Sequence, residues 1–350
     1  MDKIIIKNTK QERNRIIDML KGIAVILVIY GHLLEGRYCW PFIMLTEFHL
    51  PLFIFVSGLF FEHSYEKYKK GFIWQKVKGL LFPYIVWSAV AFAVNALLLW
   101  KAGQANEIGQ EFLSIFLYAR SVWFLIVCFL MEIMAYLCML LAKNKMSLFM
   151  AFMLFVWGIC LLVKPIALFS IYRGQWLLPY FLLGVLLSDQ KRIFTGIHKL
   201  ENWSLLKKIF AFFLTLFMFL FLTFAFMRPE LFDSFYGKFE VVVPFTGYYF
   251  IFYVLGLAGI LLSLFLSILL EKVKGVSSYL QACGKYSIDV YVIHMFFVKA
   301  YLMIMGSGRA SHLQYALFFM ISLVISLCIV LMARYILRKI KLYRLSVGGR

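Results

Sequence analysis

Long apolar runs, each about 20 residues, recur along the whole 350-residue chain. A helix rises about 1.5 Å per residue, so about 20 apolar residues cross the hydrocarbon core of a bilayer. Most of these runs are apolar on all sides, which is typical of helices that face lipid or other apolar helices in every direction. The pattern predicts ten membrane-spanning helices, at residues 16–34, 41–61, 79–100, 121–142, 147–164, 174–188, 206–227, 244–267, 286–305 and 313–337. The sixth run is short and also fits a re-entrant segment.

The segments between these runs are rich in Lys and Arg, and their distribution predicts the orientation. If the N-terminus is cytoplasmic, ten crossings place 26 basic residues in inner segments and 8 in outer ones. Cytoplasmic loops of membrane proteins carry such an excess of positive charge. Adding or removing one span in mid-chain would exchange the sides of every later loop and abolish the asymmetry. The sequence therefore predicts an all-α, polytopic membrane protein with both termini, about residues 1–15 and 338–350, in the cytoplasm.

The composition supports this assignment and excludes some classes of function. Hydrophobic residues make up 63% of the chain and charged residues 15%, against about 45–50% and 25% in soluble domains. Basic inner loops beside anionic lipid account for the net charge of +19. No basic soluble domain is left over, so nucleic-acid binding is not expected. The six cysteines show neither metal-ligand spacing nor a disulfide framework, and we expect no bound metal.

The first predicted span carries ionisable residues, which are costly inside a bilayer and therefore mark functional sites. Lys21 and His32 are eleven residues apart, almost three helical turns, so both side chains leave one face, about 16 Å apart along the axis. Asp18 and Glu35 lie three residues beyond either end, on nearly the same face. Each residue also has a structural interpretation: a snorkelling lysine, an interfacial carboxylate and a hydrogen-bonded histidine. Because these residues share one face of the helix, a functional role is favoured over a purely structural one.

The second predicted span has polar residues near its outer end and a sequence suited to close helix contact. Glu47 and His49 lie near the outer interface, where anchoring in the interface competes with a role in catalysis. Pro51 should kink the helix and free backbone carbonyls. Ser57 and Gly58 are small and permit another helix to approach closely.

Short motifs follow one another along the chain: Asp18 to His32, Phe48-His49-Leu-Pro51-Leu-Phe-Ile-Phe-Val-Ser57-Gly58, Leu81-Phe-Pro83-Tyr84, Trp123-Phe-Leu125, Leu178-Pro179-Tyr180-Phe-Leu-Leu-Gly184 and Gly284-Lys-Tyr286-Ser287-Ile-Asp-Val-Tyr291-Val-Ile-His294. Together and in this order they resemble the membrane-bound acyltransferase 3 family. The usual family signature in the first span is an arginine, ten residues and a histidine. Here Lys21 takes the arginine position, as in the branch that resembles fucose 4-O-acetylases. The resemblance implies one integral-membrane acyltransferase domain over residues 1–350.

The resemblance also implies a reaction and its partners. Family members move an acyl group, usually acetyl, from cytoplasmic acyl-CoA to a hydroxyl, often on a cell-envelope sugar. The expected partners are therefore acetyl-CoA or another acyl-CoA as donor substrate, a saccharide or lipid-linked saccharide acceptor, and membrane lipid. No further bound cofactor is expected, and the bacterial cytoplasmic membrane is the expected location.

Local chemistry is compatible with this reaction and suggests roles for the polar residues. A sugar hydroxyl is a poor nucleophile and needs a base, such as a histidine near its free pKa. We expect His32 to be that base or a transient acyl carrier, with Glu35 orienting it. Polyanionic CoA needs cations on the cytoplasmic face, for which the donor-binding candidates are Lys21, Lys76 and Lys78, although the loop lysines also serve as topology determinants. Further site candidates are Asp18, His49, Ser57, Tyr84, Trp123 and His294.

A different class of function also fits ten spans with ionisable residues inside them. A transporter or flippase for a polar solute or lipid-linked sugar would explain both features. The chain shows no convincing internal repeat, which weighs mildly against a transporter built from two related halves. A structural or signalling role is less favoured because of the polar stripe that Asp18, Lys21, His32 and Glu35 form along the first predicted span. Dependence on acyl-CoA separates the enzyme from the transporter.

Overall fold

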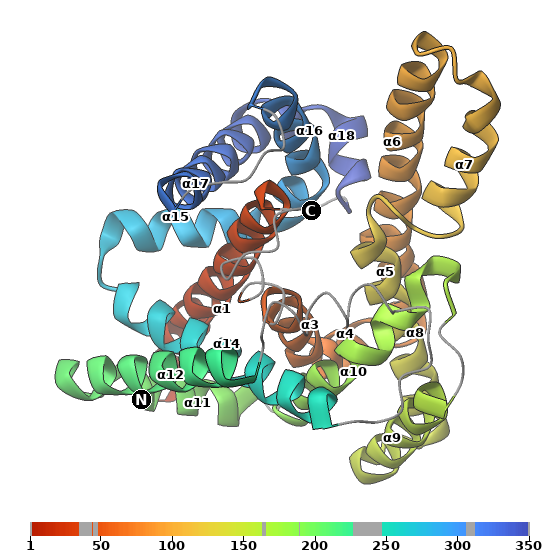
Figure 1. Ribbon diagram of the computed structural model, residues 1–350. Coiled ribbons are helices and arrows are strands. Elements are labelled where there is room, and N and C mark those ends of the chain that lie inside the picture. The colour runs from red at the N-terminus through yellow and green to blue at the C-terminus, as the bar shows by residue number, and fades with distance from the viewer. Residues whose placement is uncertain are drawn as a thin grey trace. The chain divides into compact units, whose positions relative to one another are not determined.

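The structure is a computed structural model that describes residues 2–34, 44, 48–162, 166–188, 190–226, 247–305 and 312–348. Within these ranges the chain forms helices joined by turns and short connections, and no β-strand occurs in them (Figure 1). The predicted all-α fold is confirmed for this part of the chain.

Each of the ten predicted spans overlaps a helix, and these helices are α1 (Asp2–Leu33), α3 (His49–Leu59), α6 (Phe82–Lys101), α8 (Trp123–Leu141), α9 (Met146–Leu162), α10 (Ile171–Leu186), α12 (Leu205–Phe226), α14 (Gly247–Leu270), α16 (Ser287–Met305) and α17 (His312–Tyr335). Among the described residues, six helical segments are long and apolar enough to cross a membrane: Arg15–Leu33, His49–Lys101, Trp123–Leu141, Leu205–Phe224, Phe252–Leu270 and Leu313–Lys339. Ten crossings and cytoplasmic termini stay predictions.

The chain divides into two units, and α1 is at the centre of the first, which comprises Met1–Val56 and Asp189–Tyr335. Besides α1 this unit holds α11 (Gln190–Glu201), α12, α14, α15 (Lys274–Lys285), α16 and α17. Helices α14, α15, α16 and α17 all pack against α1, and α12 pairs with α14. Phe219 of α12 and Leu255 of α14 form a buried apolar cluster with Phe48. Most of α1 beyond Arg15 is consequently covered by protein.

Two glycines bring α1 and α15 into backbone contact. A Cβ added at Gly22 would overlap the carbonyl oxygen of Leu280, and one added at Gly284 would overlap the carbonyl oxygen of Asp18. Small residues permit this closeness, as in many helix pairs of membrane proteins. Helix α15, which no predicted span includes, is therefore fixed against α1 where the polar stripe of Asp18 and Lys21 begins.

The second unit comprises Ser57–Ser188 and Ile336–Arg350, so the division falls within α3. Four fully buried phenylalanines, Phe61, Phe72, Phe149 and Phe181, make its aromatic core. Besides α6, α8, α9 and α10, its elements are α4 (Phe61–Tyr68), η1 (Lys69–Gly71), α5 (Phe72–Lys76), the π-helical turn η2 (Val77–Leu81), η3 (Ala105–Glu107), α7 (Ile108–Phe116), η4 (Leu168–Ser170), η5 (Leu337–Lys339) and α18 (Lys341–Ser346).

Gly58 confirms the close helix contact predicted for Ser57-Gly58. A Cβ at Gly58 would overlap the backbone of Phe181 and Gly184 on α10. The end of α3 and the middle of α10 are therefore held together within the second unit.

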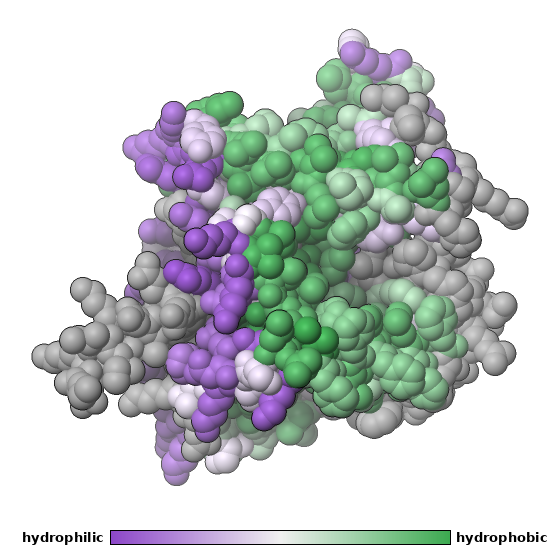
Figure 2. All heavy atoms as spheres, turned by 90° about the vertical axis from the view of Figure 1, so that its left-hand side faces the viewer, coloured by the Kyte–Doolittle hydropathy of each residue, from purple (hydrophilic) through white to green (hydrophobic). Residues whose placement is uncertain are grey.

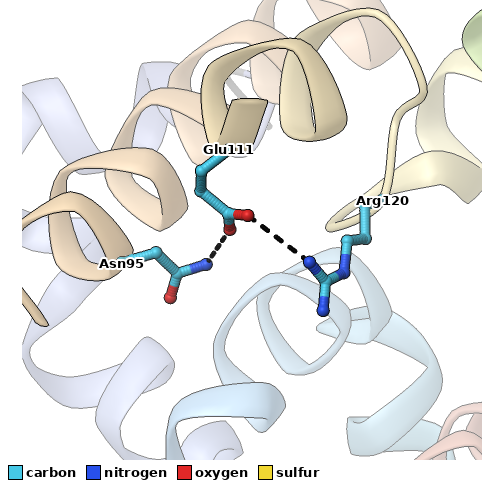
Figure 3. A network of polar contacts seen from close by, with 3 residues as sticks. All are labelled: Asn95, Glu111 and Arg120. Carbon is cyan, nitrogen blue, oxygen red and sulfur yellow. Dashed lines mark hydrogen bonds and ion pairs between the residues drawn. The ribbon is translucent and has the colours of Figure 1, made fainter. Parts of the chain in front are cut away.

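Polar contacts brace the hairpin of α6 and α7. Asn95 Nδ2 on α6 donates to Glu111 Oε1 on α7 at 2.6 Å, and Arg120 Nη1 lies 3.4 Å from Glu111 Oε2 (Figure 3). The hydroxyl of Tyr84, a predicted site candidate, donates to the carbonyl oxygen of Phe116 at 2.7 Å. Carbonyls at a helix C-terminus lack intrahelical partners, so buried Tyr84 fastens the last turn of α7.

Apolar side chains are widely exposed. On the face shown in Figure 2 they cover a continuous area, with hydrophilic side chains gathered along one border. On α12, the side chains of Phe210, Phe213, Phe217 and Phe221 are each more than half exposed. An aromatic stripe of this extent is unfavourable in water and suits contact with lipid. The helices are those of an integral membrane protein.

Candidate active site

Two of the predicted site histidines lie side by side in the first unit. His32 is in the last turn of α1 and His294 is in α16. Their ring centroids are 5.2 Å apart and the ring planes are tilted by 36°. His294 is 1% exposed, whereas His32 is only partly buried. The pair thus combines one ring enclosed by protein with one ring that retains an accessible surface.

The backbone fixes the tautomer of His294. Its Nδ1 lies 2.6 Å from the carbonyl oxygen of Tyr291. A carbonyl oxygen only accepts hydrogen bonds, so Nδ1 carries the hydrogen and Nε2 of the neutral ring holds the lone pair. Nε2 is buried and has no hydrogen-bond partner among the described residues. One basic nitrogen of the pair is therefore held in place with its lone pair unused.

The other end of the polar stripe carries an ion pair. Lys21 Nζ lies 3.6 Å from Asp18 Oδ1, and both side chains are partly exposed. Because α1 is continuous from Asp2 to Leu33, Lys21 and His32 share one face of it, as predicted, about 16 Å apart along the axis. Helix α15 contacts the Asp18 end through Gly284, while α16 contributes His294 at the His32 end.

The remaining candidates of the first unit are placed only in part. Glu35, the predicted partner of His32, and Glu47 lie outside the described residues, so the orienting role of Glu35 stays a prediction. His49 is buried, with 8% exposure, at the start of α3.

Ser57 and Lys76 meet in the second unit on a carboxylate, Glu132, that was not among the predicted site residues. Glu132 on α8 is 3% exposed. Its Oε1 lies 2.9 Å from Lys76 Nζ and accepts a hydrogen bond of 2.9 Å from Ser57 Oγ. Lys76 is therefore largely buried and paired with an internal carboxylate, whereas we expected a cation displayed in a cytoplasmic loop. A single acidic residue within an apolar run was the available signal, because such a residue is costly in a membrane.

Lys78 and Trp123 have neighbours of another kind. Lys78 is exposed, and its Nζ lies 5.0 Å from the ring centroid of Trp74. The Trp123 ring, at the start of α8, is covered by the Arg173 guanidinium at 4.3 Å. Arg173 Nε also donates to the hydroxyl of Tyr172 at 2.9 Å. The contacts of Lys78 with Trp74 and of Arg173 with Trp123 are cation–π interactions. Because Lys76 is largely buried, Lys78 is the accessible cation of the Lys76–Lys78 segment.

No group of three or more His, Cys, Asp and Glu side chains able to hold a metal ion occurs in the described part of the chain. The chemistry within reach of these residues is proton transfer, nucleophilic attack and the binding of anions or hydroxyls. The fold is that of an integral membrane protein with several buried polar groups.

Comparison with known proteins identifies the family. A family model described as an acyltransferase domain matches residues 14–333. The match covers most of the chain, and the protein belongs to this family, the membrane acyltransferase 3 family, as its motifs indicated. No match was found among curated proteins or among solved structures. The likeness to the fucose 4-O-acetylase branch stays a prediction.

Proposed function

We propose that the protein is a membrane O-acyltransferase that moves an acetyl or other acyl group from cytoplasmic acyl-CoA to a hydroxyl of a cell-envelope saccharide. Family membership supports acyl transfer. The observation that carries the proposal further is the His32–His294 pair, which puts a partly accessible imidazole beside a buried one of fixed tautomer. Hydroxyl acylation needs such a base, and a passive membrane anchor does not.

In the proposed reaction His32 accepts the proton of the acceptor hydroxyl as its oxygen attacks the thioester carbonyl. The carbon–oxygen bond forms, the carbon–sulfur bond breaks, and the departing thiolate receives the proton from His32. Two positively charged rings 5.2 Å apart would repel each other in an apolar environment, so the pair of neutral rings is suited to taking up one additional proton, the one that leaves the acceptor hydroxyl. Positioned general bases contribute roughly 10²–10⁴-fold to rates.

The polar stripe of α1 supports the donor half of the proposal. Lys21 offers an ammonium group at the predicted cytoplasmic end, paired with a carboxylate that phosphate oxygens can replace. About 16 Å of helix separates it from His32. A long acyl-CoA arm bound along this face would keep its phosphates near Lys21 and carry the thioester toward the histidines. The donor is then cytoplasmic and the protein lies in a cell membrane, which for a bacterial source is the cytoplasmic membrane.

The test is dependence on the acyl donor. Membranes containing the protein are incubated with acetyl-CoA labelled in the acetyl group, and acetylated saccharides are identified by mass spectrometry of the envelope glycans. We expect label in glycan hydroxyl esters only when the protein and acetyl-CoA are both present. Movement of a saccharide across the membrane without consumption of acetyl-CoA would overturn the proposal in favour of a transporter or flippase.

A further inference from the structure

Ser57, Lys76 and Glu132 form an ionic centre in the second unit. One atom of this centre, a carboxylate oxygen of Glu132, lacks a hydrogen-bond partner among the described residues. Ser57 and Lys76 both bind Glu132 through the same oxygen, Oε1. The other oxygen, Oε2, is buried and has no hydrogen-bond partner among the described residues. A carboxylate oxygen accepts up to two hydrogen bonds, and buried polar atoms of folded proteins are nearly always satisfied. An open acceptor on a buried carboxylate therefore needs an explanation.

The surroundings of Lys76 hold this centre in place. The lysine ends α5 and is followed at once by the π-helical turn Val77–Leu81. Turns of this type are rare and occur frequently at functional sites. Lys76 Nζ also lies 4.9 Å from the ring centroid of Phe72, which is fully buried. With its side chain 13% exposed, against 4% for Glu132, Lys76 is the more accessible member of the ion pair.

The charges of the centre limit what it can bind. The ammonium of Lys76 and the carboxylate of Glu132 neutralise each other at 2.9 Å. An anionic group would meet the carboxylate, and a cationic group would compete with the ammonium. The group that suits Oε2 is an uncharged hydrogen-bond donor, which means a hydroxyl or an amide N–H.

We infer that Glu132 Oε2 is a binding site for an uncharged hydrogen-bond donor group of a substrate. Ser57 and Lys76 are positioning residues, because both hold Oε1 and so leave Oε2 open. This inference rests on the proposed acyl transfer. Its substrates offer the group from two sources, the hydroxyls of the saccharide acceptor and the amide N–H groups of the pantetheine arm of acyl-CoA.

A Glu132→Gln substitution reverses the hydrogen bonding at this atom. With its carbonyl oxygen kept toward Ser57 and Lys76, the new side chain places an amide NH₂ group where Oε2 stands, so donor faces donor. We expect KM to rise about 10- to 100-fold for the substrate that binds there, with a smaller change in kcat. A rise in KM for the saccharide identifies the acceptor hydroxyl, and a rise for acetyl-CoA identifies the amide.

Glu111→Gln is the matched control. Glu111 is a carboxylate of the same unit that braces the α6–α7 hairpin through Asn95 and Arg120. We expect both KM values of this variant to stay within about threefold of the wild type, since the substitution is chemically the same but lies outside the ionic centre.

Because Glu132→Gln leaves the Lys76 charge buried without its partner, the double variant Lys76→Met/Glu132→Gln is measured beside it. Monodispersity and thermal unfolding in detergent report whether each variant is folded, and titration calorimetry with CoA reports donor affinity independently of turnover. Folded variants with wild-type KM values would overturn the inference while leaving acyl transfer intact. Folded variants that lack turnover, yet bind CoA with unchanged affinity and are stabilised by the saccharide acceptor against thermal unfolding as the wild type is, would also overturn it. An inactive wild type would overturn both proposals.

Discussion

Replacing Gly284 with alanine adds one methyl group where α15 touches α1. The added carbon would overlap the carbonyl oxygen of Asp18. A backbone atom cannot rotate aside as a flexible side chain can, so the two helices must separate or slide. Asp18 belongs to the ion pair with Lys21, and the displacement therefore reaches the proposed donor-binding end of the polar stripe.

The size of the effect follows from two opposing contributions. Overpacking a well-packed contact costs about 1–3 kcal/mol, and a backbone overlap belongs at the upper end of that range. Alanine in place of glycine within a helix recovers about 1 kcal/mol. The expected net loss in the free energy of unfolding is about 1–2 kcal/mol.

Gly275, in the first turn of the same helix, is the matched control. A Cβ at this position meets no atom within 4 Å, so Gly275→Ala gains helix propensity without a clash. Thermal unfolding of the purified protein in detergent should show a lower midpoint for Gly284→Ala and an unchanged or higher one for Gly275→Ala. Equal midpoints for the two variants would refute the backbone contact between α1 and α15.

Three further predictions address the donor site, the topology and the burial of α15. Lys21→Arg should retain more acyl transfer than Lys21→Ala, because it keeps the positive charge; normal acyl-CoA affinity and turnover in Lys21→Ala would remove Lys21 from donor binding. In intact cells a membrane-impermeant maleimide should label Gln104→Cys but not Lys70→Cys, since segment 62–78 is predicted to be cytoplasmic; labelling of position 70 from outside would contradict this topology. Burial raises the pKa of the Cys283 thiol to about 11, so its reactive thiolate is scarce at pH 8 and increases as the pH rises toward 11; rapid alkylation of the folded protein at pH 8 would show that α15 is not packed as described.

The helices were the predictable part of this fold. Runs of about 20 apolar residues determine where a chain can cross hydrocarbon, and each predicted run overlaps a helix of the structure. Helix α15 was not predicted because it is short and amphipathic, with polar residues beside its apolar ones. Its place depends on Gly22 of α1 and Gly284 of α15, which bring the two helix backbones together, and contact between such distant segments leaves no local signal.

Individual residues of the candidate site could be predicted from the sequence, but not which of them are neighbours in the fold. The motifs brought out both His32 and His294, yet only the packing of α1 on α16 shows that their rings are neighbours. Lys76 was assigned to a basic loop by charge counting. It lies instead against Glu132, because a buried carboxylate stabilises an ammonium that apolar surroundings would otherwise exclude.

The most direct test of the proposed acyl transfer is its rate in His32→Ala, measured with labelled acetyl-CoA and paired with thermal unfolding in detergent. His198→Ala is the control, because His198 is half exposed on α11 and its Nδ1 lies 3.5 Å from Oε2 of nearby Glu201, away from His32 and His294 in the sequence. We expect a loss of roughly 10²–10⁴-fold in His32→Ala, normal transfer in His198→Ala, and folded protein in both. Loss of a merely structural hydrogen bond would instead lower stability by about 1–3 kcal/mol and leave substantial turnover. Near-normal transfer by a stably folded His32→Ala protein would remove His32 from the mechanism.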